Sequence, residues 1–252
     1  MNRKILATII LILFQILAVT SAGCFESSTS AKLGDYAKDY LQGSKYTKLI
    51  IEIDYVEGFP PSNQALDTLR SRMYSYCDKP EGILIIPNSI PKSSSTYSDD
   101  DIRDLEDEHR NYHMKGSDIV AYVLYLNGVY STNDDALGLA YGASSIAIFK
   151  EKIDNADIPF WATNQVDNTD YEKSVLIHEF GHLLAMVNIG YESERNHEDI
   201  HKHHCINEKC VMYYSIETVS IITLITQSNP LPPSDFDDDC RHDLNMLKIG
   251  GY

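Results

Sequence analysis

The pattern of apolar and polar positions between residues 48 and 90 predicts a strand, a helix and a second strand. Lys48–Val56 (KLIIEIDYV) is rich in β-branched residues and partly alternates, as a strand does. Ser62–Tyr76 carries apolar residues at helical spacing, and Ile83–Ile86 is a short apolar run that ends at Pro87. Extended and helical periods therefore follow one another directly along this part of the chain.

The following segment continues this alternation. Asn88–Asp101 is rich in Ser and Asp, which is typical of a loop, and Ile102–His113 has the polarity of an exposed helix. Asp118–Leu126 (DIVAYVLYL) predicts a central strand, and Leu139–Phe149 predicts one or two more. Strands that alternate with helices favour an α+β (mixed α/β) fold, in which helices pack on a sheet.

The clearest predicted helix runs from Thr169 to about Val187 and contains the run HEFGH. Thr169–Glu172 fits a capping box, and the apolar residues that follow have helical spacing. Glu217–Thr226 (ETVSIITLIT) is β-branched enough for a strand, but its assignment stays open. Asp239–Ile249 predicts a closing helix whose leucines face the core.

The N-terminus has the composition of an export signal. Residues 1–24 begin with the basic start MNRK and continue as an apolar run that is too short for an ordinary membrane span. They end in S-A-G-C, which resembles a lipoprotein processing site that leaves a lipid on Cys24; an uncleaved helical anchor is the alternative. We therefore expect an exported protein, either anchored on the extracytoplasmic side of a membrane or secreted. Residues 25–44 predict a flexible tether, and residues 45–252 the folded domain.

The charge of the chain restricts its partners. The formal net charge is -16 at pH 7, with a pI near 4.8. Because like charges repel, this balance argues against nucleic acid or an anionic membrane as the partner of the folded part. A solvated acidic surface is the simplest interpretation, and we expect membrane contact only through the N-terminal signal or lipid.

The run HEFGH carries the chemistry of a zinc site. His178 and His182 are four residues apart, so on a helix both imidazoles can face one ion. Glu179 projects beside them, where it can act as a general base on a zinc-bound water without being a ligand. Two hydrogen-bonded core histidines without metal are the alternative. A catalytic zinc normally has three protein ligands, and four histidines nearby are candidates for the third: His197, His201, His203 and His204.

A second motif follows the first. His204-Cys205, four residues, Cys210 and, after one more residue, Met212 give the pattern H-C-x4-C-x-M. Together with HEFGH, this pattern resembles the archaemetzincins, a family of the metzincin clan of zinc metallopeptidases. The resemblance implies a twisted sheet with packed helices, an active-site helix, and an edge strand within Leu139–Phe149 that holds an extended substrate. It also implies an N-terminal subdomain, residues 45–187, and a small C-terminal subdomain, residues 188–252.

The resemblance also implies roles for single residues. Zinc would be bound by His178, His182 and His204, with Glu179 as the general base. Met212 would form the Met-turn, an apolar floor beneath the metal. Tyr214 resembles a tyrosine that in some clan members binds zinc or stabilises the tetrahedral intermediate; ordinary packing is the alternative.

The chain departs from the clan pattern after His182. Ala185 and Asn188 stand where the clan has a glycine and the third ligand. We therefore expect an insertion, Asn188–His203, through which the chain leaves the helix, for instance at Gly190, and returns at the third ligand. If there is no such insertion, His197 or His201 becomes the ligand.

The cysteines are the second departure. Archaemetzincins resemble one another in holding a structural zinc with C-x4-C and a later C-x-x-C, whereas here the later element is Cys240-Arg241-His242-Asp243. A zinc site built from Cys205, Cys210, Cys240 and either His242 or Asp243 is one expectation. A disulfide among the three cysteines is the other, with Cys77 either free or the fourth partner.

These features together predict a monomeric zinc-dependent peptidase that acts on a peptide or protein substrate. It would hold one catalytic Zn²⁺, with a second, structural Zn²⁺ depending on the cysteines. The alternative from another functional class is a non-catalytic surface lipoprotein that binds zinc through its histidine cluster. A third is an inactive scaffold of the same fold.

Overall fold

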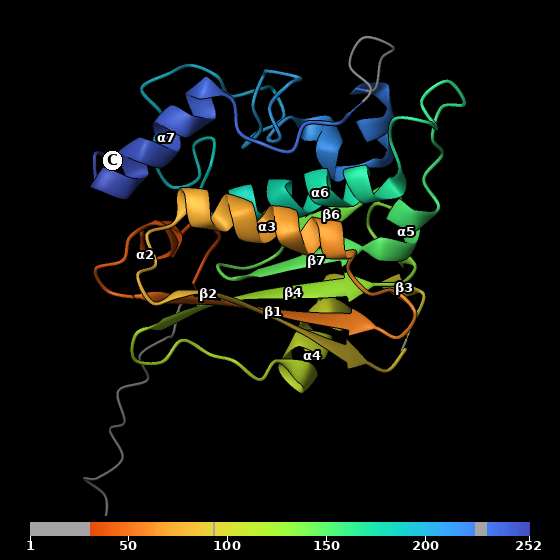
Figure 1. Ribbon diagram of the computed structural model, residues 1–252, viewed down its shortest axis with the longest axis horizontal. Coiled ribbons are helices and arrows are strands. Elements are labelled where there is room, and N and C mark those ends of the chain that lie inside the picture. The colour runs from red at the N-terminus through yellow and green to blue at the C-terminus, as the bar shows by residue number, and fades with distance from the viewer. Residues whose placement is uncertain (1–30, 93, 225–230) are drawn as a thin grey trace, which may run out of the picture. The chain divides into compact units, whose positions relative to one another are not determined.

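A five-stranded mixed sheet forms the centre of the folded chain (Figure 1). The computed structural model describes residues 31–92, 94–224 and 231–252, and Ala31–Tyr252 form one compact unit. The strand order is β2-β1-β4-β7-β6; the first four strands are parallel, and β6 is antiparallel to β7. The strands are β1 (Lys48–Val56), β2 (Gly82–Ile90), β4 (Asp118–Leu126), β6 (Gly138–Ala140) and β7 (Ser145–Phe149). A separate parallel pair consists of β3 (Thr96–Tyr97) and β5 (Val129–Tyr130). The mixed α/β fold expected from the sequence is confirmed.

Helices cover both faces of the sheet, which explains why the central strand β4 is apolar from Ile119 to Leu126. Alternate residues of β4 belong to two cores: Ile119 and Val123 pack on the side of α3 (Asn63–Tyr76) and α6 (Asn168–Leu183). Leu124 packs with residues of α4 (Asp99–His109) on the opposite side. Figure 1 shows the same arrangement, with α3 and α6 above the sheet and α4 below it. A strand that is buried on both faces forms a nearly continuous apolar run, without the alternation of a half-exposed strand.

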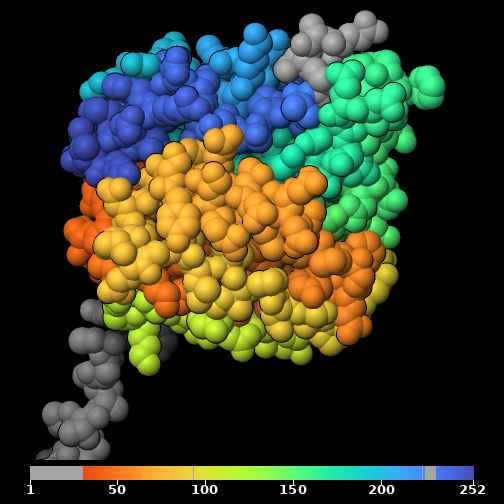
Figure 2. All heavy atoms as spheres, viewed as in Figure 1, coloured from red at the N-terminus to blue at the C-terminus, as the bar shows by residue number. Residues whose placement is uncertain are grey.

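The remaining helices are short, apart from the C-terminal helix α7. They are α2 (Ala37–Leu41), α5 (Lys150–Asp154), α7 (Asp238–Ile249) and the 3-10 helices η1 (Tyr214–Glu217) and η2 (Val219–Leu224). The sequence leaves the assignment of Glu217–Thr226 open. In the structure this segment contains the end of η1 and all of η2, so it is not a strand as far as Leu224. In the space-filling view, the blue C-terminal segment packs against the yellow and orange α3 (Figure 2), where Tyr76 donates a 2.6 Å hydrogen bond to Asp235. No helix within the described ranges is long and apolar enough to cross a membrane.

The predicted N-terminal segments have different outcomes. The export signal and Cys24 lie outside the described residues. The expected tether, residues 25–44, is wrong from residue 31 onward, because α2 packs into the core there. Tyr40 is buried and its hydroxyl donates a 2.9 Å hydrogen bond to the carbonyl of Val120. The polar residues around α2 conceal its few apolar ones, so composition alone suggests a linker.

Two predicted boundaries on the sheet side are wrong for local reasons. The second strand does not stop at Pro87 but continues to Ile90, because β2 is an edge strand in which a missing N–H can face away from the ladder. The polar helix begins at Asp99 instead of Ile102. Ser98 caps it, and Asp101 completes a capping box at the positive end of the helix dipole.

Helix α6 also begins and ends earlier than predicted. Its N-cap is Asp167, whose side chain accepts hydrogen bonds from the backbone N–H groups of Thr169 and Asp170, and the capping box pairs Asp167 with Asp170. The expected Thr169–Glu172 box is therefore wrong by two residues, since an aspartate caps as well as a threonine does. The helix ends at Leu183 rather than near Val187.

Candidate metal centre

Helix α6 places the polar side chains of HEFGH inside the protein. His178 and Glu179 are fully buried, and His182 is 6% exposed. The two imidazoles lie one helical turn apart, with 3.1 Å between their Nε2 atoms. Two ring nitrogens that face each other at this distance in a buried site need a proton or a cation between them.

The chain leaves α6 through a turn of left-handed backbone. Ala185, Val187 and Asn188 have φ values of 61°, 59° and 65°. The turn is closed by hydrogen bonds from Ala185 N to His182 O and from Met186 N to Gly181 O, both 3.0 Å. The exit that we expected at Gly190 is therefore at Ala185, where the clan has its glycine. An alanine there adopts the same conformation at a cost of about 1–2 kcal/mol.

After this turn, the segment 188–203 loops out and returns at His204. The return is fixed by hydrogen bonds from Asp199 N to His204 O at 2.7 Å and from Cys205 N to Met212 O at 2.8 Å. The ring of His204 lies 5.2 Å from that of His178 and 5.1 Å from that of His182, measured between centroids. The structure thus brings His204 to the helical pair.

The other three candidate histidines lie elsewhere. His201 stacks on Tyr214 with 4.0 Å between ring centroids. His203 is half exposed, and its Nδ1 lies 3.3 Å from the carbonyl of Val187. His197 is buried beside a cluster of cysteines. The histidine-rich stretch is therefore not a single metal-binding tract.

Backbone carbonyls fix the ring orientations of the clustered histidines. His178 Nδ1 donates to the carbonyl of Val211 at 2.6 Å, and His204 Nδ1 donates to that of Lys202 at 2.9 Å. Each ring therefore presents its Nε2 lone pair to the centre of the cluster. His204 Nε2 and His182 Nδ1 are buried without a hydrogen-bond partner in the described part of the chain. Zinc prefers neutral imidazoles whose second ring nitrogen donates a hydrogen bond to a protein oxygen. The residues of the cluster therefore fit a zinc ion.

Met212 lies directly beneath the helix that carries the two histidines. It is fully buried, and a Cβ at Gly181 would overlap its sulfur. The glycine of HEFGH is thus required because Met212 packs against the helix backbone at that point. A role for Met212 as an apolar floor beneath a metal stays a prediction.

Glu179 lies beside the cluster without contacting its centre. Both carboxylate oxygens are buried, and no side chain in the described part of the chain donates a hydrogen bond to them. Burial, and then the negative charge of Glu217, raise the pKa of Glu179 well above its usual value, while the backbone of Ala140 opposes this. The carboxylate fits against the edge strand because Gly138 has no side chain there: a Cβ at Gly138 would overlap Glu179 Oε1. The result is a carboxylate with a high proton affinity.

Glu217 is a member of the cluster that the sequence analysis missed. Its Oε2 lies 3.4 Å from His204 Nε2 and 3.7 Å from His178 Nε2. The potential ligand atoms of His178, His182, His204 and Glu217 all lie within 4.8 Å of one another. Burial opposes ionisation of Glu217, but the two histidines outweigh it and hold its pKa well below the usual value. Only its position shortly after Met212 could have suggested this, since no motif marks it.

Tyr214 has a different environment from the one that the resemblance implies. It opens η1, and the ring contacts observed are stacking on His201 and a tilted contact with Tyr213 at 4.7 Å between centroids. A catalytic role for Tyr214 stays a prediction.

The cysteines form a second cluster. Sulfur atoms of Cys205, Cys210 and Cys240 and a carboxylate oxygen of Asp237 lie within 4.8 Å of one another. The Sγ atoms of Cys210 and Cys240 are 3.5 Å apart, and all four cysteines in the described ranges, Cys77 included, are unbridged. Hydrogen bonds from the neighbouring thiols Cys205 and Cys240 favour the thiolate form of Cys210 and lower its pKa. The arrangement matches a zinc site better than a disulfide.

The fourth member of the cysteine cluster is neither of the two residues that we expected, His242 and Asp243. His242 faces the exposed Glu194 at 3.3 Å, and Asp243 bonds to His197 at 2.8 Å. Asp237 lies in the cluster, and His197 Nδ1 lies 3.8 Å from Cys240 Sγ. Sequence spacing favoured the residues next to Cys240, but these point away from it around the helix.

Solved structures similar to the chain include two archaemetzincins and a metalloproteinase. The archaemetzincin from Methanopyrus kandleri is 15% identical, with a TM-score of 0.49; the alignment covers 80% of this chain and 95% of that one. The archaemetzincin from Archaeoglobus fulgidus, complexed with malonate, is 14% identical, with a TM-score of 0.42, and the shares covered are 77% and 98%. Metalloproteinase-II from Bacteroides fragilis is 13% identical, with a TM-score of 0.41, and the shares are 83% and 55%.

Comparison with family profiles and with curated sequences adds no further relative. No protein-family model matches the chain, and no curated protein matches it.

Asp243 ties the segment after α6 to the C-terminal helix. It is fully buried and accepts hydrogen bonds from Tyr191, Ser193, His197 and Tyr252 at 2.5–3.0 Å. Burial favours its neutral form, but these donors, led by His197, outweigh burial and lower its pKa.

We expect Asp243→Asn to lower the free energy of unfolding by about 2–4 kcal/mol, because an amide turns its NH₂ toward buried donors. Since the pKa of Asp243 is lower in the folded state, its contribution is present above the unfolded pKa near about 4 and is lost as the pH falls. Urea unfolding at several pH values measures both effects. The matched control is Asp239→Asn, whose carboxylate makes an exposed ion pair with Arg195, and we expect a change below about 1 kcal/mol. Equal effects of the two variants would contradict the role of Asp243.

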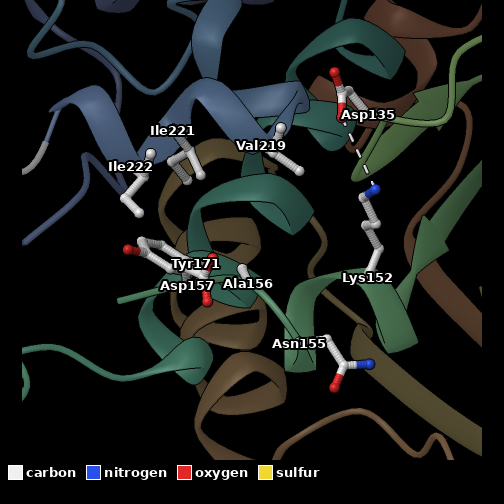
Figure 3. A pocket seen from close by; sticks show the side chains of 9 residues that line it. All are labelled: Asp135, Lys152, Asn155, Ala156, Asp157, Tyr171, Val219, Ile221 and Ile222. Carbon is white, nitrogen blue, oxygen red and sulfur yellow. Dashed lines mark ion pairs between the residues drawn. The ribbon is translucent and has the colours of Figure 1, made fainter. Parts of the chain in front are cut away.

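A cavity of about 440 Å³ lies between α6 and η2. Its lining includes Tyr171 from α6 and Val219 and Ile221 from η2, and Lys152 faces Asp135 at its rim at 3.9 Å (Figure 3). The wall formed by η2 begins two residues after Glu217. Residues that are close together in the sequence therefore contribute to the cavity and to the histidine cluster.

Proposed function

We propose that the protein is a zinc-dependent peptidase of the archaemetzincin type. The observation that carries the proposal is the convergence of three histidines, two of them oriented by backbone carbonyls, beside the buried carboxylate of Glu179, to which no described side chain donates a hydrogen bond. A purely structural metal site has no use for the second feature, since a buried unpaired carboxylate is costly.

The residues divide the chemistry between them. His178, His182 and His204 would hold the zinc ion, which when bound supplies a Lewis acid for the scissile carbonyl and acidifies a water molecule. Glu179 is the general base, because it is close to the cluster and its raised pKa lets it accept a proton and pass it to the leaving amine.

The substrate is a peptide or protein segment in extended conformation. β6 is the edge strand of the sheet, and its Gly138 lies against Glu179, so a chain that pairs with β6 passes the general base. The cavity beside η2 would accept an apolar side chain of such a substrate. We propose a monomer that acts outside the cytoplasm, on the basis of the N-terminal sequence.

Zinc storage by the histidine-rich segment is the competing function. It requires several histidines that share exchangeable ions, whereas His197, His201 and His203 each have a separate environment. The cysteine cluster would bind a second, structural zinc ion.

Metal content and peptide cleavage together test the proposal. Purified protein should contain one tightly bound zinc ion at the histidine cluster, and should cleave a mixture of fluorogenic peptides. A chelator should abolish cleavage, and added Zn²⁺ should restore it. Several weak, exchangeable ions without cleavage would instead favour storage.

Gly138→Ala should lower turnover by about 10- to 100-fold, because the added Cβ displaces the Glu179 carboxylate. Zinc affinity should not change. The matched control is Gly142→Ala, where the nearest side-chain atom to the new Cβ is in Ser145 at 3.7 Å, an ordinary contact. The comparison of kcat for the two variants measures the effect, and equal kcat values would argue against this placement of Glu179.

A further inference from the structure

The carboxylate of Glu217 lies where a fourth metal ligand would lie. Its Oε2 is 3.4 Å from His204 Nε2 and 3.7 Å from His178 Nε2, and 3.1 Å separates the Nε2 atoms of the helical histidines. In a tetrahedral zinc site with bonds of about 2.0–2.2 Å, ligand atoms lie about 3.3–3.6 Å apart. These separations are close to the edges of such a tetrahedron.

An ordinary ion pair does not explain this arrangement. His178 and His204 each donate Nδ1–H to a backbone carbonyl, so each directs a lone pair toward the carboxylate of Glu217. Lone pairs and a carboxylate repel one another in a buried site unless a positive charge lies among them. A single proton on His204 would pair that ring with Glu217, but the lone pair of His178 would still face the carboxylate. A single divalent cation satisfies all four groups.

The backbone holds Glu217 at this position. Its carbonyl accepts a 2.8 Å hydrogen bond from Leu137, and Val219 N donates to Asp135 O at 3.0 Å. Thr218 forms an antiparallel bridge with Ala136 between them. The residues after η1 are thus paired with the stretch that leads into β6, directly beside the expected path of a substrate.

We propose that Glu217 is a fourth protein ligand of the catalytic metal. Its carboxylate closes the site at rest and swings out when substrate binds. This inference rests on the proposed function, because it assigns a role at the same site. Catalytic zinc sites have three protein ligands and an open position, whereas sites with four are closed. The side chain of Glu217 is 34% exposed, so part of it borders solvent.

Substitution of the metal by Co²⁺ tests the assignment without relying on turnover. Full-length protein is loaded with Co²⁺, and visible absorption spectra are compared for wild type, Glu217→Ala and Glu217→Gln. Loss of the carboxylate should change the d–d bands of the histidine site, while thiolate bands from the cysteine cluster stay constant as an internal reference. Affinity for acetohydroxamate, which needs an open position on the metal, should rise about tenfold or more in both variants.

The matched control is Glu194→Gln. Glu194 also faces a histidine, with 3.3 Å to His242, but outside the cluster and exposed to solvent. Its spectrum and acetohydroxamate affinity should equal those of wild type. Glu217→Gln retains the shape of the side chain, so it gives the result even where the alanine variant folds poorly.

The outcomes separate this proposal from the proposed function. Altered d–d bands and tighter acetohydroxamate binding, without peptide cleavage by wild type or any variant, support Glu217 as a metal ligand and argue against peptidase activity. Unchanged bands and affinity, together with normal cleavage, overturn the ligand assignment and leave the peptidase intact. Faster cleavage by Glu217→Ala with altered bands supports both.

Discussion

Glu179→Gln should lower kcat by about 10³-fold and leave zinc bound. General-base catalysis contributes about 10²- to 10⁴-fold, and an amide cannot accept the proton. Zinc should stay bound because Glu179 lies beside the histidine cluster and is not among the groups whose ligand atoms converge. The measurement is kcat at saturating peptide together with zinc content.

Glu179→Asp is the matched variant for this prediction. It retains the carboxylate but moves it back by one methylene, about 1.5 Å, so we expect a kcat between those of wild type and Glu179→Gln. Turnover by Glu179→Gln close to the wild-type rate would show that Glu179 is not the base.

His204→Ala should weaken zinc binding by about 10²- to 10³-fold. Zinc binding to four-ligand sites is worth about 10–16 kcal/mol, or about 3–4 kcal/mol for each ligand. The effect should be confined to His204, because the other histidines of its segment are held elsewhere. Competition with a chromogenic chelator gives the affinity of each variant.

The control for this prediction is His203→Ala, one residue earlier in the chain. Its side chain is 47% exposed, and its Nδ1 lies 3.8 Å from Glu198, so we expect wild-type zinc affinity. A loss of affinity in His203→Ala that matches the loss in His204→Ala would exclude His204 as the specific third ligand.

The sequence contains the parts of the site that depend on local spacing. A spacing of four residues on an apolar helix places His178 and His182 on the same face, whatever the rest of the fold does. The register of His204 with Met212 could also be inferred, since both belong to one short motif. The continuous apolar run of β4 likewise predicts its burial on both faces.

Other parts of the site depend on contacts between distant segments. Glu217 reaches the cluster because the residues that follow it pair with the stretch before β6, and no local pattern reports that pairing. The helix exit at Ala185 was misplaced because alanine seldom adopts a positive φ. Helix α2 was missed because a single buried face of five residues carries too little periodicity.

His204 and Cys205 are neighbours in the chain, yet one belongs to the histidine cluster and the other to the cysteine cluster. Val211, whose carbonyl orients His178, is likewise next to Cys210. An ion in the cysteine cluster would therefore fix the backbone from which the histidine cluster takes its third ligand and one of its orienting carbonyls. The two ions would then load cooperatively, because the first has already removed part of the chain entropy that the second must overcome.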